Sequence, residues 1–204
     1  MFDTYISTNE FYVLVAIVGY FAGSIPFGLI LTKLAGGGDI RAIGSGSIGA
    51  TNVLRTGRKG LAAATMALDA SKGAIVVLLA HTQSVDLAAV AGFAAVIGHN
   101  FPIWLKFKGG KGVATSAGVL LAISWPVGVA IALTWLAVVA LTRYSSVGAL
   151  VSCAVLPLWA WLLSNEVVLW LAVILAVLGI ARHHENIRRL MRGEESRIGR
   201  KRAG

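Results

Sequence analysis

Long uncharged runs dominate this chain of 204 residues, and they constrain its fold more than any other feature. Seven stretches are apolar almost throughout: residues 11–34, 61–80, 87–105, 113–123, 127–141, 147–163 and 167–181. A membrane-spanning helix needs about 20 mostly apolar residues, because lipid offers no hydrogen-bond partner to the backbone. The sequence therefore predicts an all-α polytopic membrane protein with about seven transmembrane helices, of which the fourth is the shortest.

The composition excludes a soluble domain and a disordered chain. Hydrophobic residues make up 57% of the sequence and charged residues 13%, whereas soluble domains have about 45–50% and about 25%. The single cysteine, Cys153, lies inside an apolar run, which excludes a disulfide framework and a cysteine-based metal cluster. The longest polar segment, residues 36–60, is too short for an appended domain. We therefore expect residues 1–204 to form one integral-membrane domain.

The positive charges indicate the orientation of the chain. The formal charge is +9, and nearly all Lys and Arg follow the odd-numbered runs. They are Arg41, Arg55, Arg58 and Lys59, then Lys106, Lys108 and Lys111, then Arg143, and finally eight residues between 182 and 202. The N-terminal ten residues and the other connections contain no Lys or Arg, and they contain the acidic residues Asp3, Glu10, Asp86 and Glu166. Because cytoplasmic loops are enriched in Lys and Arg, the N-terminus is predicted outside and the C-terminus in the cytoplasm.

The first connection carries a glycine-rich segment. Gly44, Gly46 and Gly49 have the G-x-G-x-x-G spacing of dinucleotide sites, but that fold needs a preceding strand, and a membrane span precedes here. Glycines still allow backbone N–H groups to approach a phosphate closely. Arg41 and Arg55 flank them and can bind phosphate oxygens. The alternative is a flexible Gly/Ser linker.

A second glycine-rich segment follows the third run. Lys108, Gly109, Gly110, Lys111 and Gly112 precede an apolar helix. The segment lacks the spacing of a Walker A nucleotide site. Glycines and two lysines at a helix start nevertheless predict an anion site, with free N–H groups and the positive end of the helix dipole. The alternative is topological anchoring by the lysines plus a tight turn.

A third polar segment follows the last run. His183 and Asn186 are three apart and would share a helix face, while the adjacent His184 would point elsewhere. Because no H-E-x-x-H spacing exists, we do not expect zinc. His183 is a candidate hydrogen-bond donor, phosphate partner or base. The alternative is an amphipathic tail on anionic lipid, which we expect in any case for residues 197–202.

The second apolar run contains two charges, Asp69 and Lys72, on one helical face. Ionisable residues at that depth are costly and pair with one another. We expect an ion pair that holds this helix in the bundle. The three polar segments together predict a cytoplasmic site for a phosphorylated small molecule, belonging to an enzyme or a carrier.

At the level of whole motifs the chain resembles the acyl-phosphate:glycerol-3-phosphate acyltransferases of bacterial membranes. The matching segments are residues 23–28, 39–55, 98–102, 107–115 and 183–190, with Glu195. The resemblance implies transfer of a fatty acyl group from acyl phosphate to the 1-hydroxyl of sn-glycerol 3-phosphate. The products would be lysophosphatidate and phosphate, made at the cytoplasmic face of the bacterial inner membrane.

The resemblance also implies roles for individual residues. Those we expect to be catalytic are Ser45, Arg55, Lys111, His183 and Asn186. Those we expect to bind substrate or phosphate are Gly44, Gly46, Thr51, Asn52, Lys108, Gly109, Gly110, Gly112 and Glu195. Glu195 would also organise the site. Ser47 stands where the family usually has Asn, which leaves open what that amide does.

The expected reaction requires no cofactor, metal or covalent acyl-enzyme, because acyl phosphate is already an activated anhydride. Ser45 would hydrogen-bond rather than attack, since no base is evident beside it. The proton acceptor is either His183 or a phosphate oxygen of the substrate. The expected partners are acyl phosphate, glycerol 3-phosphate and the bilayer, with no nucleic acid, and the protein would act as a monomer. The rival functions are an organophosphate transporter, although no polar path crosses the runs, and a structural subunit, which leaves the glycines unexplained.

Overall fold

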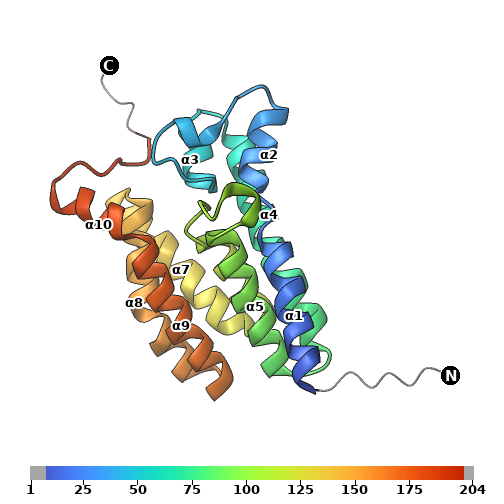
Figure 1. Cartoon of the computed structure of the whole chain (residues 1–204). Helices are drawn as coiled ribbons and strands as arrows, with labels where there is room; N and C mark the ends of the chain where they lie inside the picture. Colours follow the sequence, from blue (N-terminus) through green and yellow to red (C-terminus); the bar gives the residue numbers. More distant parts are fainter. Residues whose placement is uncertain (1–7, 200–204) are drawn as a thin grey trace. The chain divides into compact units, whose positions relative to one another are not determined.

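The chain folds entirely into helices and loops over residues 8–199, the part that the structure, a computed structural model, describes (Figure 1). The expectation of an all-α protein is confirmed for these residues. The predictions that involve Asp3 at the N-terminus and residues 200–202 in the tail lie outside the described residues.

The helices group into two compact units, residues Met1–Ile123 and Ser124–Gly204. In order, the first unit contains α1 (Thr8–Gly23), α2 (Phe27–Leu34), η1 (Ile40–Ala42), α3 (Ala50–Leu54), α4 (Lys59–His81), α5 (Val85–Asn100), η2 (Ile103–Leu105) and α6 (Val113–Ile123). The second contains α7 (Trp125–Thr142), α8 (Ser145–Leu163), α9 (Glu166–Arg182) and α10 (His184–Met191). In the first unit α5 packs against α1, α4 and α6, and in the second α8 packs against α7 and α9. The prediction of one membrane domain stays a prediction.

All seven apolar runs are helical, but they differ in length. Five helices or helix pairs are long and apolar enough to span a membrane: Thr8–Leu34, Lys59–His81, Val85–Leu105, Trp125–Thr142 and Ser145–Leu163. A sixth candidate is the pair of α9 and α10, which is bent by 54°. Helix α6 has only 11 residues, fewer than a span requires. The count of seven spans therefore stays a prediction.

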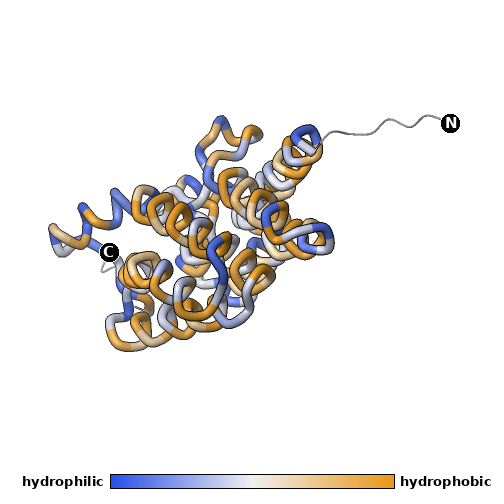
Figure 2. Tube along the Cα trace, turned by 90° about the horizontal axis from the view of Figure 1, so that it is seen from below, coloured by the Kyte–Doolittle hydropathy of each residue, from blue (hydrophilic) through white to orange (hydrophobic). Residues whose placement is uncertain are grey.

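Small residues allow the helices of the first unit to approach closely. A Cβ atom at Gly23 would lie 2.0 Å from the carbonyl oxygen of Ala95 on α5, and one at Gly118 of α6 would lie 2.0 Å from that of Ala70 on α4. Because lipid is as apolar as the side chains, membrane helices associate largely through such close packing. The outer faces keep exposed large hydrophobic side chains such as Leu79 and Leu141, and hydrophobic colouring dominates the long helices in Figure 2.

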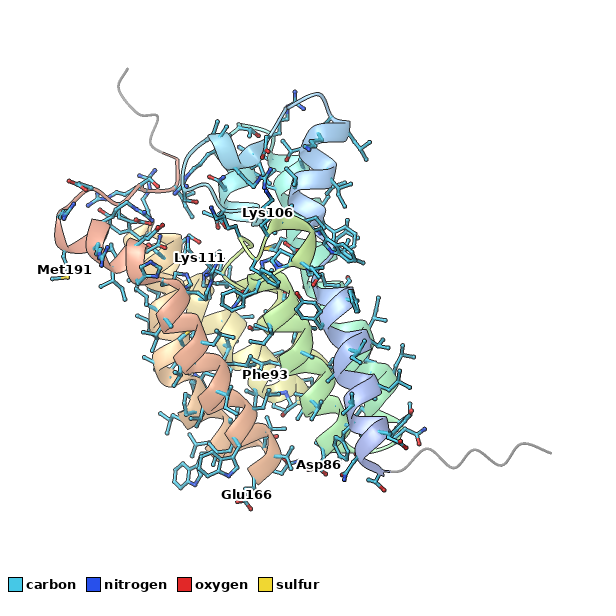
Figure 3. The ribbon with its side chains drawn as sticks, in the orientation of Figure 1. Asp86, Phe93, Lys106, Lys111, Glu166 and Met191 are labelled. Carbon is cyan, nitrogen blue, oxygen red and sulfur yellow. The ribbon has the colours of Figure 1, made fainter. Side chains whose placement is uncertain are left out.

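Polar and charged residues gather at the ends of each unit. In the first unit Asp86 lies at the opposite end from Lys106 and Lys111, and in the second Glu166 lies at the opposite end from Met191 (Figure 3). This separation, seen within each unit, agrees with the segregation of charge along the sequence.

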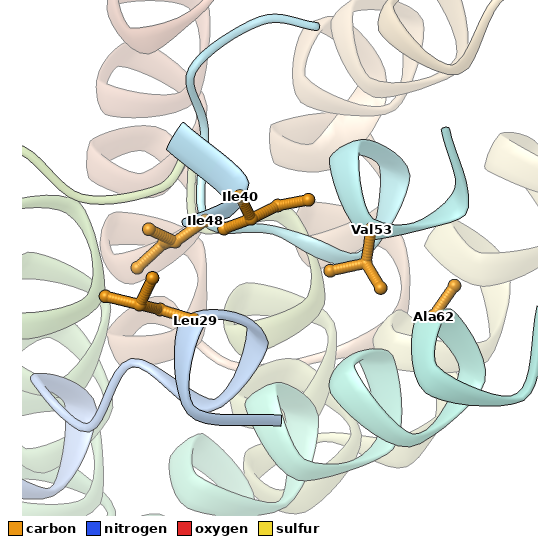
Figure 4. Packing of buried hydrophobic residues seen from close by; sticks show 5 residues of the cluster. All are labelled: Leu29, Ile40, Ile48, Val53 and Ala62. Atoms are coloured by element: carbon orange, nitrogen blue, oxygen red, sulfur yellow. The ribbon is translucent and has the colours of Figure 1, made fainter. Parts of the chain in front are cut away.

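The first connection is a folded segment with its own small core. Leu29, Ile40, Ile48, Val53 and Ala62 are buried together beneath it (Figure 4). Ile40 and Val53 are fully buried, which a flexible Gly/Ser linker would not produce. The linker interpretation of this segment is therefore wrong.

Candidate active site

The buried side chain of Asn52 organises the first glycine-rich segment. Its Nδ2 lies 2.9 Å from the carbonyl oxygen of Ile40, 3.1 Å from that of Ile43 and 2.8 Å from that of Ser47. Ile40 begins the short helix η1, and the other two carbonyl groups lie in irregular loop. The amide thus supplies partners that regular secondary structure does not.

The other end of Asn52 reaches two of the predicted catalytic residues. Its Oδ1 accepts hydrogen bonds from the backbone N–H of Ser45 and from Nη1 of Arg55, each at 3.1 Å. Asn52 is 2% exposed and both of its polar atoms are used by the loop. This geometry favours a positioning role for Asn52 over the substrate contact expected from the sequence.

The glycines of this segment are required by backbone conformation and by space. Gly44 and Gly46 have φ angles of +59° and +68°, which L-residues with a Cβ atom rarely adopt. A Cβ atom at Gly44 would lie 2.3 Å from Oδ1 of Asn52. The Ser45 N–H between them is already donated to Asn52, so it is not a free phosphate donor in this conformation. Thr51 is exposed on α3.

Ser47, at the family's usual Asn position, has a local partner. Its Oγ accepts a hydrogen bond from the N–H of Gly49 at 3.3 Å. This is the turn-forming bond that an Asn side chain makes equally well. The Ser47 hydroxyl thus serves as an acceptor just before α3.

Arg41 is engaged within the same segment. Its guanidinium and backbone N–H bind the carboxylate of Asp39 at 2.6–3.2 Å. The hydrogen bonds from the Arg41 side chain and backbone lower the pKa of Asp39 to about 2. The phosphate contact expected of Arg41 is therefore replaced, in this structure, by a local ion pair.

In the second glycine-rich segment, the expectation of free N–H groups is wrong for two residues. Gly109 donates its N–H to the carbonyl oxygen of Asn100 at 3.2 Å, and Gly110 donates to that of His99 at 3.0 Å. A Cβ atom at Gly109 would lie 2.2 Å from the backbone oxygen of His99, and one at Gly110 would lie 2.0 Å from Nε2 of His99. These glycines fasten the loop to the end of α5.

Further donors lie at the start of the following helix. Gly112, with φ +82°, leads into α6, whose first-turn N–H groups have no partner in the helix itself. Lys111 is half-buried just before it, and Lys108 is exposed. The positive end of the helix dipole adds to these charges. The anion site predicted here is thus displaced toward Lys111 and the start of α6.

Asn100 lies beside this segment, although no role was predicted for it from the sequence. It is fully buried, and neither atom of its amide has a hydrogen-bond partner among the described residues. A Cβ atom at Gly112 would lie 2.9 Å from its Oδ1, so the amide faces the loop. A buried polar group of this kind is normally satisfied, which indicates a place for a ligand or water.

The two glycine-rich segments lie side by side in the first unit. Leu105 of η2, just before the second segment, packs against the core of the first. A Cβ atom at Gly28 would lie 2.0 Å from the carbonyl oxygen of Ile48, so α2 closes on the same core. The first unit therefore packs the first segment, α2 and the residue just before the second segment against a common core.

In the second unit His183 lies at the bend between α9 and α10 and is 3% exposed. Its Nδ1 is 2.7 Å from the carbonyl oxygen of Gly179. A carbonyl oxygen only accepts, so Nδ1 carries a proton and donates. In the neutral ring the lone pair is then on Nε2, which is the arrangement that a base requires.

Glu195 collects three side chains near α10. Its Oε1 accepts from Oγ of Ser146 at 2.9 Å and from Nδ2 of Asn186 at 2.7 Å, and its Oε2 accepts from Nε of Arg189 at 2.7 Å. Burial opposes ionisation, but the hydrogen bonds from Arg189, Asn186 and Ser146 outweigh it and lower the pKa of the Glu195 carboxyl. Glu195 is thus an organising carboxylate.

Asn186 keeps one unused group. Its Oδ1 is buried and has no hydrogen-bond partner among the described residues. Because Glu195 holds the Nδ2 end, the orientation of the amide is fixed and Oδ1 is presented as an acceptor. Asn186 and Glu195, both predicted site residues, thus meet in the second unit.

The segment after α10 turns back onto the start of α8. Ile198 donates its N–H to the carbonyl oxygen of Arg143 at 2.8 Å, and Nη2 of Arg143 donates to the Ile198 oxygen at 3.0 Å. Nε of Arg197 donates to the hydroxyl of Tyr144 at 3.0 Å, with the guanidinium 5.1 Å from the ring centre. Arg197 therefore has a partner within the protein, and the expectation that residues 197–202 rest on anionic lipid stays a prediction.

Comparisons with known proteins agree with this geometry. The family model described as "Glycerol-3-phosphate acyltransferase" matches residues 13–193. A glycerol-3-phosphate acyltransferase of Rhodospirillum rubrum is 56% identical over 195 residues, covering 91% of this chain and 90% of that protein. One of Paramagnetospirillum magneticum is 59% identical over 182 residues, covering 89% and 90%.

A solved structure is similar over nearly the whole fold. It is the crystal structure of PlsY (YgiH), an integral membrane glycerol 3-phosphate acyltransferase, in its glycerol 3-phosphate form. The TM-score is 0.87 with 38% sequence identity, over 92% of this chain and 96% of that one. A lysophosphatidic acid form of the same protein gives 0.84 and 37%, over 92% and 95%. From its helices, its glycine-rich segments and these relatives, the chain belongs to the glycerol-3-phosphate acyltransferase family of integral membrane proteins.

Proposed function

We propose that this protein transfers a fatty acyl group from acyl phosphate to the 1-hydroxyl of sn-glycerol 3-phosphate. The hydroxyl oxygen attacks the acyl carbon, the carbon–oxygen bond to phosphate breaks, and the hydroxyl proton passes to a base. The products are lysophosphatidate and inorganic phosphate. The family supports the acceptor, and the related structure is known in glycerol 3-phosphate and lysophosphatidic acid forms.

The observation that carries the proposal is the anion site at the start of α6. Lys111, the first-turn N–H groups and the unsatisfied amide of Asn100 supply charge and donors for phosphate oxygens. The Arg55 guanidinium is exposed and oriented by Asn52 in the same unit. Two anionic substrates repel each other, and fixed cations that neutralise this repulsion hold them in reacting geometry.

We assign proton removal to His183. Its Nδ1–H is donated to Gly179, so its Nε2 is the atom with the lone pair. Asn186, oriented by Glu195, presents Oδ1 as an acceptor for a substrate hydroxyl. Ser45, half-buried beside Asn52, serves as a hydrogen-bonding residue rather than as a nucleophile.

We place the enzyme in the bacterial inner membrane with its active site at the cytoplasmic face, acting as a monomer. The support is the charge segregation of the sequence, with the N-terminus outside and the C-terminus inside. The seven-span count is part of this proposal, with α6 as the shortest segment.

The test is phosphate release by the purified protein from acyl phosphate in the presence of glycerol 3-phosphate. Acyl thioesters are tested as alternative donors. With glycerol 3-phosphate present, we expect acyl transfer from acyl phosphate and none from a thioester. We expect Lys111→Ala and Arg55→Ala to lose turnover while remaining folded, whereas Lys59→Ala, an exposed lysine at the start of α4, keeps it. Activity with thioesters only, or uptake of labelled glycerol 3-phosphate into proteoliposomes without transfer, would overturn the proposal.

A further inference from the structure

Three ionisable side chains form a buried cluster in the first unit. Asp69 and Lys72 of α4 and His99 of α5 are 1%, 5% and 3% exposed. Nζ of Lys72 lies 2.8 Å from Oδ1 of Asp69, so the ion pair expected from the sequence is present. The third member was not expected, since its approach depends on how α5 packs against α4.

The ammonium group of Lys72 also contacts two other residues. Besides Asp69, its Nζ lies 2.8 Å from the carbonyl oxygen of Ile25 and 2.9 Å from Nδ1 of His99. Ile25 lies at the break between α1 and α2, where a carbonyl group inside a membrane needs a partner. A protonated lysine has three donors and no acceptor.

The contact with Lys72 fixes the tautomer of His99. Because Lys72 can only donate, Nδ1 of His99 must accept, and the proton of the neutral ring is then on Nε2. Asp69 does not compete for a proton on Nδ1, since its Oδ1 is 3.6 Å away, beyond hydrogen-bond distance. His99 therefore has the opposite tautomer to His183.

Nε2 of His99 faces the second glycine-rich segment. A Cβ atom at Gly110 would lie 2.0 Å from it, and the backbone oxygen of His99 accepts the Gly110 N–H at 3.0 Å. The ring and the backbone of His99 thus both lie against the same glycine. Lys111 follows Gly110 directly, so its position depends on this attachment.

We propose that the Asp69–Lys72 pair sets the Nε2–H tautomer of His99, and that His99 is a positioning residue that fixes the loop of residues 108–112. The claim that this loop binds substrate rests on the proposed function, whereas the assignment of the His99 tautomer is independent of it. A structural ion pair alone would need neither His99 nor the glycine against its ring.

The first test compares two variants of His99. His99→Gln retains an N–H donor near the position of Nε2, whereas His99→Phe keeps the ring shape without a donor. We expect kcat/KM for glycerol 3-phosphate to fall about 100-fold in His99→Phe, the size of effect that a small misplacement causes, and less than about 10-fold in His99→Gln. Equal losses in the two variants, or no loss in either, would overturn the proposal.

The second test removes the charges without leaving one unpaired. A buried ion pair replaced by apolar residues often leaves a protein stable, so the double variant Asp69→Leu/Lys72→Met is expected to fold. It should lose activity as His99→Phe does, with thermal unfolding near that of the unaltered protein. Unaltered kcat/KM in this folded variant would make the pair purely structural.

The third test reads the tautomer directly by ¹⁵N NMR of histidine-labelled protein in detergent. The signal removed by His99→Gln should belong to a ring with its proton on Nε2, and a proton on Nδ1 would contradict the assignment. His81→Gln, at the exposed end of α4, is the matched control and should leave activity unchanged. If the unaltered protein transfers no acyl group, the proposed function fails, but this measurement still decides the tautomer.

Discussion

The carboxylate of Glu195 fixes the orientation of the Asn186 amide, because it accepts from Nδ2 at 2.7 Å while Oδ1 of the same amide is left without a partner. An amide rotated by half a turn would place its oxygen against the carboxylate, which is repulsive. The direction in which Asn186 presents its acceptor is thus set by a residue nine positions away, through a turn that begins at Gly193.

Glu195→Gln should disturb this arrangement without changing its size. A glutamine offers only one acceptor oxygen to Ser146, Asn186 and Arg189, so at least one donor is left unsatisfied. We expect kcat to fall by about 10–100-fold and stability by about 1–3 kcal/mol, measured by phosphate release and thermal unfolding. Glu194→Gln, one residue earlier and exposed, is the control. Unaltered turnover in Glu195→Gln would remove Glu195 from the site.

The same carboxylate predicts how stability depends on pH. Its pKa is lowered in the folded protein, so the ionised form favours folding. This contribution is present above the ordinary glutamate pKa, about 4.3, and is lost as pH falls through the lower folded value. Thermal unfolding between about pH 3 and pH 5 should show a smaller pH dependence in Glu195→Gln than in the unaltered protein. Identical slopes would contradict the assignment.

Asn52→Ala should damage the first glycine-rich segment although Asn52 need not touch substrate. The substitution removes the amide donor from the carbonyl groups of Ile40 and Ser47 and one hydrogen bond from the Arg55 guanidinium. We expect the free energy of unfolding to fall by about 2–4 kcal/mol, because several buried groups are left unsatisfied, and we expect activity to fall as well. Asn165→Ala, which removes a cap bond at the start of α9, is a control expected to reduce stability but not the KM for glycerol 3-phosphate. Unaltered stability of Asn52→Ala would contradict the organising role.

Ser47→Asn should be tolerated. The Ser47 hydroxyl accepts from the Gly49 N–H, and an Asn carboxamide oxygen forms the same turn with one extra donor. We expect activity within about threefold of the unaltered protein, as for half-exposed substitutions in compatible turns. The measurement is kcat/KM for both substrates. A decrease in kcat/KM of more than tenfold would contradict this expectation and show that the serine is adapted to this chain.

The helices could be predicted because lipid imposes a simple rule on length and polarity, and each of the seven apolar runs is helical. The break at Pro26 and the short α6 follow from local residues too. The site was predictable only as segments. Glycines beside Arg55 and Lys111 indicate phosphate, but which N–H groups remain free depends on what packs nearby.

The residues that the sequence could not assign show this dependence. Gly109 and Gly110 donate to α5, which no local pattern reveals. Asn52 is a residue type that commonly binds substrate, but here it holds the loop together, since its partners are carbonyl groups up to 12 positions away. The roles of His99 and Asn100 follow from the packing of α5 against α4 and α6. The contact of Arg197 with Tyr144 was not expected, because the two residues lie 53 positions apart in the sequence.

Gly110→Ala should abolish activity because of a steric clash, and not because the backbone requires a glycine. The φ angle of Gly110 is not among the positive ones, so alanine fits the backbone, but its Cβ would lie 2.0 Å from Nε2 of His99. The ring or the loop must move, and Lys111 moves with the loop, so we expect kcat/KM to fall by at least about 100-fold. Gly60→Ala is the matched control, because nothing lies within 4 Å of its Cβ position in α4. It should be neutral or stabilising by up to about 1 kcal/mol. Wild-type kinetics in Gly110→Ala would show that the loop tolerates displacement and would contradict its placement in the site.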